Sequence, residues 1–131
     1  MINYNEIMEL HTILESDRLL LRPFSLEDAA DVYLYASDEL VTKYLTWPAL
    51  KEPSESLKVI KTFYMGKTGI FAIELKSEHK CIGCIDLRLF NEHDKASFGF
   101  VLNRHYWNNN YMSEAFNLIL DLSFSDRKSV V

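Results

Sequence analysis

Three consecutive asparagines, Asn108, Asn109 and Asn110, stand between a predicted strand and a predicted helix and are the first candidates for chemistry. A polar loop that opens a helix gathers unpaired backbone N–H groups at the positive end of the helix dipole, and such a point binds anions such as pyrophosphate. The backbone there often needs positive φ, which asparagine tolerates best after glycine, and the asparagine amide can donate to phosphate. A polar loop with capping asparagines explains the same residues without a ligand, so both interpretations stay open.

Two carboxylates on predicted strands, Asp86 and Glu74, are candidates for a general base. Alternation along a strand also explains both as solvent-facing residues, which is the commoner case. The histidines have no partners at metal-ligand or triad spacing, and they lie at positions 11, 79, 93 and 105. We therefore expect no metal site.

Cys81 and Cys84 form a C-x-x-C pattern, which could serve redox chemistry or supply half of a zinc site. The surrounding residues predict a strand, on which positions three apart point to opposite faces, and no second Cys/His pair completes four ligands. We expect both thiols to be small core residues.

The elements that must position these residues follow from hydrophobic spacing and turn residues. Strands are predicted at residues 18–22, 70–75, 81–90 and 96–102, the last three as an antiparallel meander. Helices are predicted at 26–36, within 38–45, from Pro53 onward and at 111–124. This order predicts an α+β domain with helices packed on a mostly antiparallel sheet.

Two of the predicted helices carry an apolar stripe that should face the core. The stripes are Leu57, Ile60, Phe63 and Tyr64 on the second long helix and Met112, Ala115, Phe116, Ile119 and Leu122 on the last one. Because of this spacing, core packing is preferred over an acceptor pocket for Phe63 and Tyr64. At the first helix, Ser25 and Asp28 suit an N-terminal cap.

The length and charge of the chain limit the classes of function that it can have. The chain has 131 residues, 48% of them hydrophobic, which is enough for one core, so we expect a single domain over residues 1–131 with 1–10 as an extension. The net charge of −5, without a long Lys/Arg run, argues against nucleic-acid binding and mildly favours an amine-bearing partner. Without a long apolar stretch or a basic leader, we expect a cytoplasmic protein that does not bind membranes.

Four segments, in order along the chain, carry a resemblance to a known family. They are residues 17–23 (Asp-Arg-Leu-Leu-Leu-Arg-Pro), 82–85 (Ile-Gly-Cys-Ile), 96–102 (Ala-Ser-Phe-Gly-Phe-Val-Leu) and 106–115 (Tyr-Trp-Asn-Asn-Asn-Tyr-Met-Ser-Glu-Ala). From residue 10 to its last residue the chain resembles the ribosomal-protein-alanine acetyltransferase branch (RimJ/RimL type) of the GNAT superfamily. The resemblance implies an acyl-CoA N-acyltransferase fold, acetyl-CoA as co-substrate and transfer of its acetyl group to a primary amine, for which a protein N-terminus is one choice.

The same resemblance implies where the co-substrate lies. The backbone of Phe100, Val101 and Leu102 would bind the pantetheine arm like an added strand. The residues that would hold the pyrophosphate are Trp107, Asn108, Asn109, Asn110, Tyr111, Met112 and Ser113, with Arg104 adding positive charge. The family usually has glycines at positions 108 and 110 and a small residue at 112, so we expect weaker acetyl-CoA binding than in a glycine-containing relative.

The catalytic residues are less directly implied. Many members of the family place a glutamate on the central strand where this chain has Ser97, and a serine hydroxyl can order a water but is a poor base alone. Asp86 and Glu74 are the carboxylates expected to replace that glutamate. Trp47 and Glu74 are candidate contacts for the acceptor.

The family fold continues beyond the helix at 111–124 with a strand, a helix and a final strand pair, whereas residues 125–131 remain here. We expect a fold that lacks its C-terminal strands, with an open sheet edge that favours a homodimer; a longer reading frame is the alternative. Two other functions stay open: a catalytically inactive acyl-CoA-binding or regulatory domain, and an α+β interaction module without a cofactor.

Overall fold

A computed structural model describes residues 13–43, 48–66, 69–89 and 96–130, and the side chains of residues 87–89, 96–98 and 121–130 are not among those described. The described strands are β1 (Leu14–Glu15), β2 (Leu19–Arg22), β3 (Ile70–Leu75), β4 (Lys80–Leu89) and β5 (Ala96–Leu102). The α-helices are α2 (Ala29–Ala36), α3 (Glu39–Thr42), α4 (Pro53–Val59) and α5 (Tyr111–Val130). The other helical turns are the 3-10 turns η1 (Leu26–Asp28) and η3 (Arg104–Tyr106) and the π-helical turn η2 (Ile60–Tyr64).

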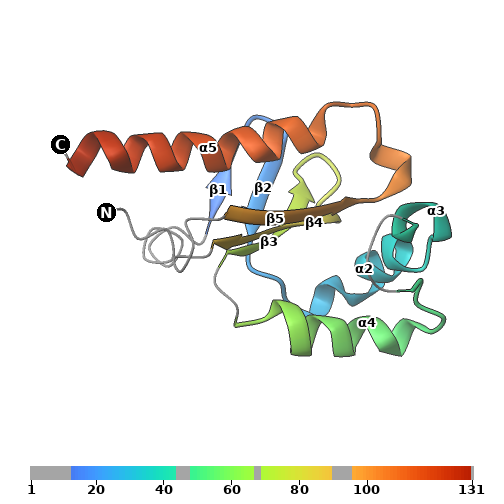
Figure 1. Cartoon of the computed structure of the whole chain (residues 1–131). Coiled ribbons are helices and arrows are strands. Elements are labelled where there is room, and N and C mark those ends of the chain that lie inside the picture. Colours follow the sequence, from blue (N-terminus) through green and yellow to red (C-terminus); the bar gives the residue numbers. More distant parts are fainter. Residues whose placement is uncertain (1–12, 44–47, 67–68, 90–95, 131) are drawn as a thin grey trace.

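The five strands form one sheet in the order β1-β2-β3-β4-β5, and every pairing is antiparallel. Figure 1 shows α5 lying across one face of this sheet and α2, α3 and α4 along the other. The predicted α+β class and the meander of the last three strands are confirmed. Strand β1 was not predicted, because its two residues are too few to show a hydrophobic period.

The face of the sheet under α5 carries one of two hydrophobic core clusters. Leu19 and Leu21 of β2, Ile73 of β3 and Ala115 and Ile119 of α5 belong to it, and each is nearly or fully buried. The predicted inward face of the last helix is confirmed at these two positions. The helix runs to Val130 and not to residue 124 as predicted, because residues 125–130 contain neither proline nor glycine to end it.

The opposite face of the sheet packs against α2 and α4. Here a β-bulge changes which residues face the helices, since Ile73 pairs with Gly83 but Glu74 with Cys81. Cys81 and Cys84 consequently both lie in this second core cluster. The expectation that the two cysteines point to opposite faces was wrong, because the bulge adds one residue to the strand between them. Their expected burial in the core is confirmed.

The helix that starts at Pro53 differs from the predicted stripe. Ser56 and Ile60 are fully buried, whereas Leu57 is partly exposed and Phe63 is 56% exposed. The residues that face the core are therefore four positions apart. The change to π-helical geometry over Ile60–Tyr64 alters which side chains of the last turn face the core. The prediction of core packing was wrong for Phe63 and is confirmed for Tyr64, whose ring stacks on Phe24 with centroids 4.4 Å apart.

Candidate functional site

The loop between β5 and α5 has the backbone conformation that its asparagines predicted. Asn108 has φ of 66° and Asn110 has φ of 62°, both in the left-handed region. Asparagine adopts this region more readily than other residues with a Cβ. The two asparagines thus stand at the positions where the backbone needs a residue tolerant of positive φ.

The helix that follows directs its first amides into this loop. The intrahelical ladder of α5 begins with the N–H of Glu114 donating to the carbonyl of Asn110 over 3.1 Å. The N–H groups of Tyr111, Met112 and Ser113 precede that bond, in the turn where helices leave amides without internal acceptors. With a helix of 20 residues behind them, these amides make a site suited to an anion.

Two side chains brace the loop from within. The Asn109 amide donates to the carbonyls of Tyr106 and Trp107, over 3.3 and 3.2 Å. The Trp107 indole N–H donates to the carbonyl of Leu102 over 2.9 Å. The side-chain amide of Asn109 therefore binds backbone carbonyls inside the loop and is not directed at a ligand. The Leu102 carbonyl already accepts a hydrogen bond from Trp107.

Two further contacts fix the start of the loop to other parts of the fold. Arg104 forms an ion pair with Asp38, the N-cap of α3, with 2.9 Å between Nε and Oδ2. Tyr106 donates its hydroxyl to Glu78 in the turn between β3 and β4 over 2.8 Å. The positive charge of Arg104, expected to attract phosphate, is thus neutralised by a neighbouring carboxylate.

The end of the loop is held by Glu114 in the first turn of α5. Its carboxylate accepts hydrogen bonds from the Ser16 hydroxyl and from the Arg18 backbone N–H, and it pairs with the Arg18 guanidinium, with Nε 2.7 Å from Oε1. Desolvation opposes ionisation of Glu114, but the hydrogen bonds from Ser16 and Arg18 together lower its pKa below the ordinary carboxyl value. As an acid in the first turn, Glu114 complements the helix dipole. It also ties the helix to the turn between β1 and β2.

The strand leading into the loop lies at the edge of the described sheet, since among the described strands β5 pairs with β4 alone. Val101 and Leu102 are buried and Phe100 is 52% exposed. β5 leaves no room for a side chain at Gly83 of β4, where an added Cβ would lie 2.3 Å from the Val101 carbonyl oxygen. An extended ligand would lie along the edge of β5 that faces away from β4.

The catalytic candidates fall on adjacent strands. Asp86 of β4 pairs with Gly99 of β5, and position 97 lies two residues from Gly99 along the same strand. Positions 86 and 97 are therefore diagonal neighbours on the sheet. Trp47, the candidate acceptor contact, lies outside the described residues.

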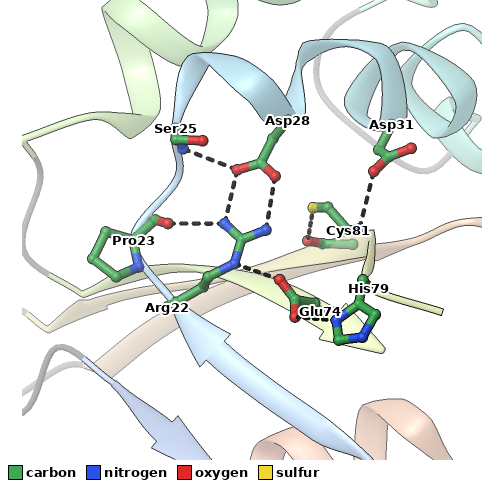
Figure 2. Close-up of polar contacts among 9 residues, drawn as sticks. Arg22, Pro23, Ser25, Asp28, Asp31, Glu74, His79 and Cys81 are labelled. Atoms are coloured by element: carbon green, nitrogen blue, oxygen red, sulfur yellow. Dashed lines mark hydrogen bonds and ion pairs between the residues drawn. The ribbon is translucent and has the colours of Figure 1, made fainter. Parts of the chain in front are cut away.

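Glu74 lies apart from Asp86, at the other end of β3, where its neighbours are Leu20 and Cys81. Figure 2 shows its carboxylate accepting from Arg22 Nε over 2.9 Å. The structure does not bring Glu74 together with Asp86, and it engages the Glu74 carboxylate in an ion pair.

Three contributors to the site were not predicted from sequence: Arg18, the Tyr106–Glu78 contact and the close approach at Gly83. Arg18 and Glu114 are 96 positions apart, so no local pattern joins them. The glycine inside a predicted strand was the one usable signal, because such a glycine often marks a close backbone approach.

No cluster of three or more potential metal ligands occurs among the residues the structure describes. Within the same part of the chain, no helix combines the length and the apolar character needed to cross a membrane.

Comparison with known proteins places the chain in a family. Residues 18–130 match the model of the "Acetyltransferase (GNAT) domain". The chain is 30% identical over 118 residues to the uncharacterized N-acetyltransferase YoaA of Bacillus subtilis (strain 168), covering 86% of this chain and 67% of that protein. The matched region spans between 64% and 67% of the length of the curated relatives.

Solved structures agree in fold. The GNAT-family acetyltransferase from Bacillus anthracis is 28% identical with a TM-score of 0.77, and the match covers 88% of this chain and 68% of that one. The microcin C7 self-immunity acetyltransferase MccE, solved with acetyl-CoA and AMP, is 19% identical with a TM-score of 0.66, covering 81% of this chain and 62% of that one. With its sheet, its loop and these matches taken together, the chain belongs to the acetyltransferase (GNAT) domain family.

Proposed function

We propose that this chain is the acetyl-CoA-binding part of an N-acetyltransferase that transfers an acetyl group to a primary amine. The observation that carries the proposal is the loop at residues 108–113, in which two left-handed asparagines lead into the first amides of α5. A diphosphate is the anion that matches a row of such amides. Because the chain belongs to the acetyltransferase (GNAT) family, we infer that acetyl-CoA is the molecule that contains this diphosphate.

The co-substrate would follow the strand away from this loop. With its diphosphate on the amides of Tyr111, Met112 and Ser113, the pantetheine arm would run back along the edge of β5 past Leu102 and Phe100. The thioester end would then approach Gly99. Asp86 is opposite Gly99 on the neighbouring strand.

This placement suggests the roles of the two catalytic candidates. Asp86 would accept the proton that the amine loses, directly or through a water ordered by Ser97. The amine nitrogen forms a bond to the acetyl carbon, the carbon–sulfur bond breaks, and the CoA thiolate takes up a proton as it leaves. The amides and dipole at the start of α5 would stabilise negative charge on the co-substrate.

For the acceptor we propose a protein N-terminal amine, as in the RimJ/RimL branch. The support is the sequence resemblance at residues 17–23 and 106–115, two segments that touch each other through Arg18 and Glu114. The expected homodimer and the cytoplasmic location stay predictions. Sedimentation at micromolar concentration tests the dimer.

Calorimetry and thermal unfolding with acetyl-CoA test the proposal. A ligand at 100 times its Kd adds about 2.7 kcal/mol of stability, which a thermal shift detects. We expect binding, followed by release of free CoA thiol when amine-bearing peptides are added, and loss of that release in Asp86→Asn. Absence of any shift would favour an interaction module without cofactor, and binding without thiol release would favour a catalytically inactive acyl-CoA-binding domain.

A further inference from the structure

We propose that Arg18 is a positioning residue for the diphosphate of the co-substrate, acting by holding the peptide between Asn109 and Asn110 in its binding orientation. This inference rests on the proposed function, since it concerns the same loop. It adds a residue from the turn before β2, far from the loop in sequence.

The guanidinium of Arg18 contacts three residues of the loop and the first turn of α5. Arg18 Nη2 donates to the carbonyl of Asn109 over 3.0 Å, and Nε donates to Glu114 over 2.7 Å. Its central carbon lies 4.4 Å from the centroid of the Tyr111 ring, in cation–π contact. The planar fork of arginine thus spans the junction where the loop becomes α5.

The contact with Asn109 fixes a peptide plane. The described chain has no cis peptide bond, so the carbonyl of Asn109 and the N–H of Asn110 lie in one peptide plane and point in opposite directions within it. With the carbonyl directed at Arg18, that N–H is directed away from the guanidinium. Asn110, on one side of this plane, has positive φ, and asparagine tolerates both positive and negative φ, so the local sequence alone would not prevent rotation of the plane.

The same contact lies beside the first turn of α5, where the amides of Tyr111, Met112 and Ser113 precede the first intrahelical hydrogen bond. By holding the Asn109 carbonyl, Arg18 sets the direction of the Asn110 N–H next to these amides, without contacting the anion itself.

The charge of Arg18 argues for positioning rather than for direct binding. Its guanidinium is paired with the Glu114 carboxylate, which also accepts from the Ser16 hydroxyl and the Arg18 N–H. A cation so paired adds little net charge to the loop. Its contribution is instead to hold the loop backbone in one orientation.

The experiment compares two ligands that differ in the diphosphate. The Kd of CoA is measured by calorimetry, and the Kd of pantetheine, which has the same arm without diphosphate, by NMR titration at millimolar concentration. In Arg18→Gln we expect CoA binding to weaken about tenfold, the effect of removing one set of charge-assisted contacts, with pantetheine binding unchanged. Arg18→Lys should weaken CoA binding similarly, because a lysine ammonium lacks the planar fork whose separate nitrogens reach Asn109 and Glu114.

The matched control is Lys76→Gln. Lys76 binds Glu15 and the Ser16 carbonyl in the same turn but does not reach the loop, so its loss should leave both Kd values unchanged. Thermal unfolding of each variant verifies that it is folded, and Arg18→Lys serves if Arg18→Gln is not.

Several outcomes would overturn the inference. Unchanged CoA binding in Arg18→Gln would do so, and so would equal weakening of both ligands, which indicates a merely structural role. Full recovery in Arg18→Lys would show that charge alone matters. If the unmodified protein binds CoA no better than pantetheine, the proposed diphosphate site fails, which is a different result from failure of Arg18.

Discussion

The guanidinium of Arg22 forms a two-pronged ion pair with the carboxylate of Asp28, with both nitrogen–oxygen distances 2.8 Å (Figure 2). Asp28 is almost completely buried and also accepts from the backbone N–H of Ser25, which caps the start of the first helix. Arg22 also donates to Glu74 of β3 and to the carbonyl of Pro23. The hydrogen bond to Asp28 is the largest effect raising the pKa of Arg22, so the guanidinium stays charged and joins β2, η1 and β3.

Replacing Arg22 should therefore destabilise the protein strongly. Arg22→Met leaves the buried Asp28 carboxylate without its cation, and breaking a buried pair on one side costs about 3 kcal/mol or more. Denaturant unfolding measures the loss. Lys76→Gln, which breaks an exposed pair with Glu15, should cost far less, and equal losses in the two variants would contradict the special role of Arg22.

Gly83 should tolerate no side chain. In Gly83→Ala the new Cβ would lie 2.3 Å from the Val101 carbonyl oxygen, so β4 and β5 would have to separate. We expect a loss of at least about 2 kcal/mol in unfolding free energy, as for other overpacked sites. Gly99→Ala is the control, because nothing lies within 4 Å of its added Cβ, and similar stabilities for the two variants would refute this explanation.

Asn110 should be replaceable by glycine but not by alanine. Its φ of 62° costs a residue with a Cβ about 1–2 kcal/mol unless, like asparagine, it adapts to this region. Asn110→Ala should therefore lower the unfolding free energy by about 1 kcal/mol. Asn110→Gly should bind acetyl-CoA more tightly, since the Cβ no longer crowds the approach of the phosphate. Calorimetry that finds no tighter binding would count against that crowding.

The two cysteines should be inert in the folded protein. Burial is the main cause that raises the pKa of Cys81 to about 12, and Cys84 is buried in the same cluster. Because the thiolate is the reactive form, iodoacetamide at pH 8 should modify neither residue until the chain is unfolded in urea. Mass spectrometry gives the count of modified thiols. Rapid labelling of the native protein at Cys81 would show that this part of the core opens readily.

The order of the elements could be predicted from sequence because it rests on local signals: apolar alternation in β3 to β5, the cap at Ser25 and the proline at the start of α4. The positive φ of Asn108 and Asn110 was likewise a local prediction. The bulge near Cys81 and the π-helical turn at Ile60–Tyr64 were not, since each depends on the neighbouring strand or helix.

The contacts that hold the candidate site together were the least predictable part. Arg104 was expected to face a phosphate and instead pairs with Asp38, which comes from a helix start 66 positions earlier. Glu114 looked like a simple first-turn acid, although its partners Ser16 and Arg18 lie at the other end of the chain. A single sequence contains no signal for such pairs.

Glu114 should make stability depend on pH in the acid range. Its folded-state pKa lies below the ordinary value of 4.5, so the folded protein binds the proton less readily than the unfolded chain. The stabilisation is therefore fully present above about pH 5 and is lost as pH falls through 4.5 towards the lowered value. Glu114→Gln removes the titrating group, so the unfolding free energies of this variant and the unmodified protein should differ at pH 7 and converge towards pH 3. A difference that stays constant from pH 7 to pH 3 would show that the Ser16 and Arg18 contacts do not favour the ionised carboxylate.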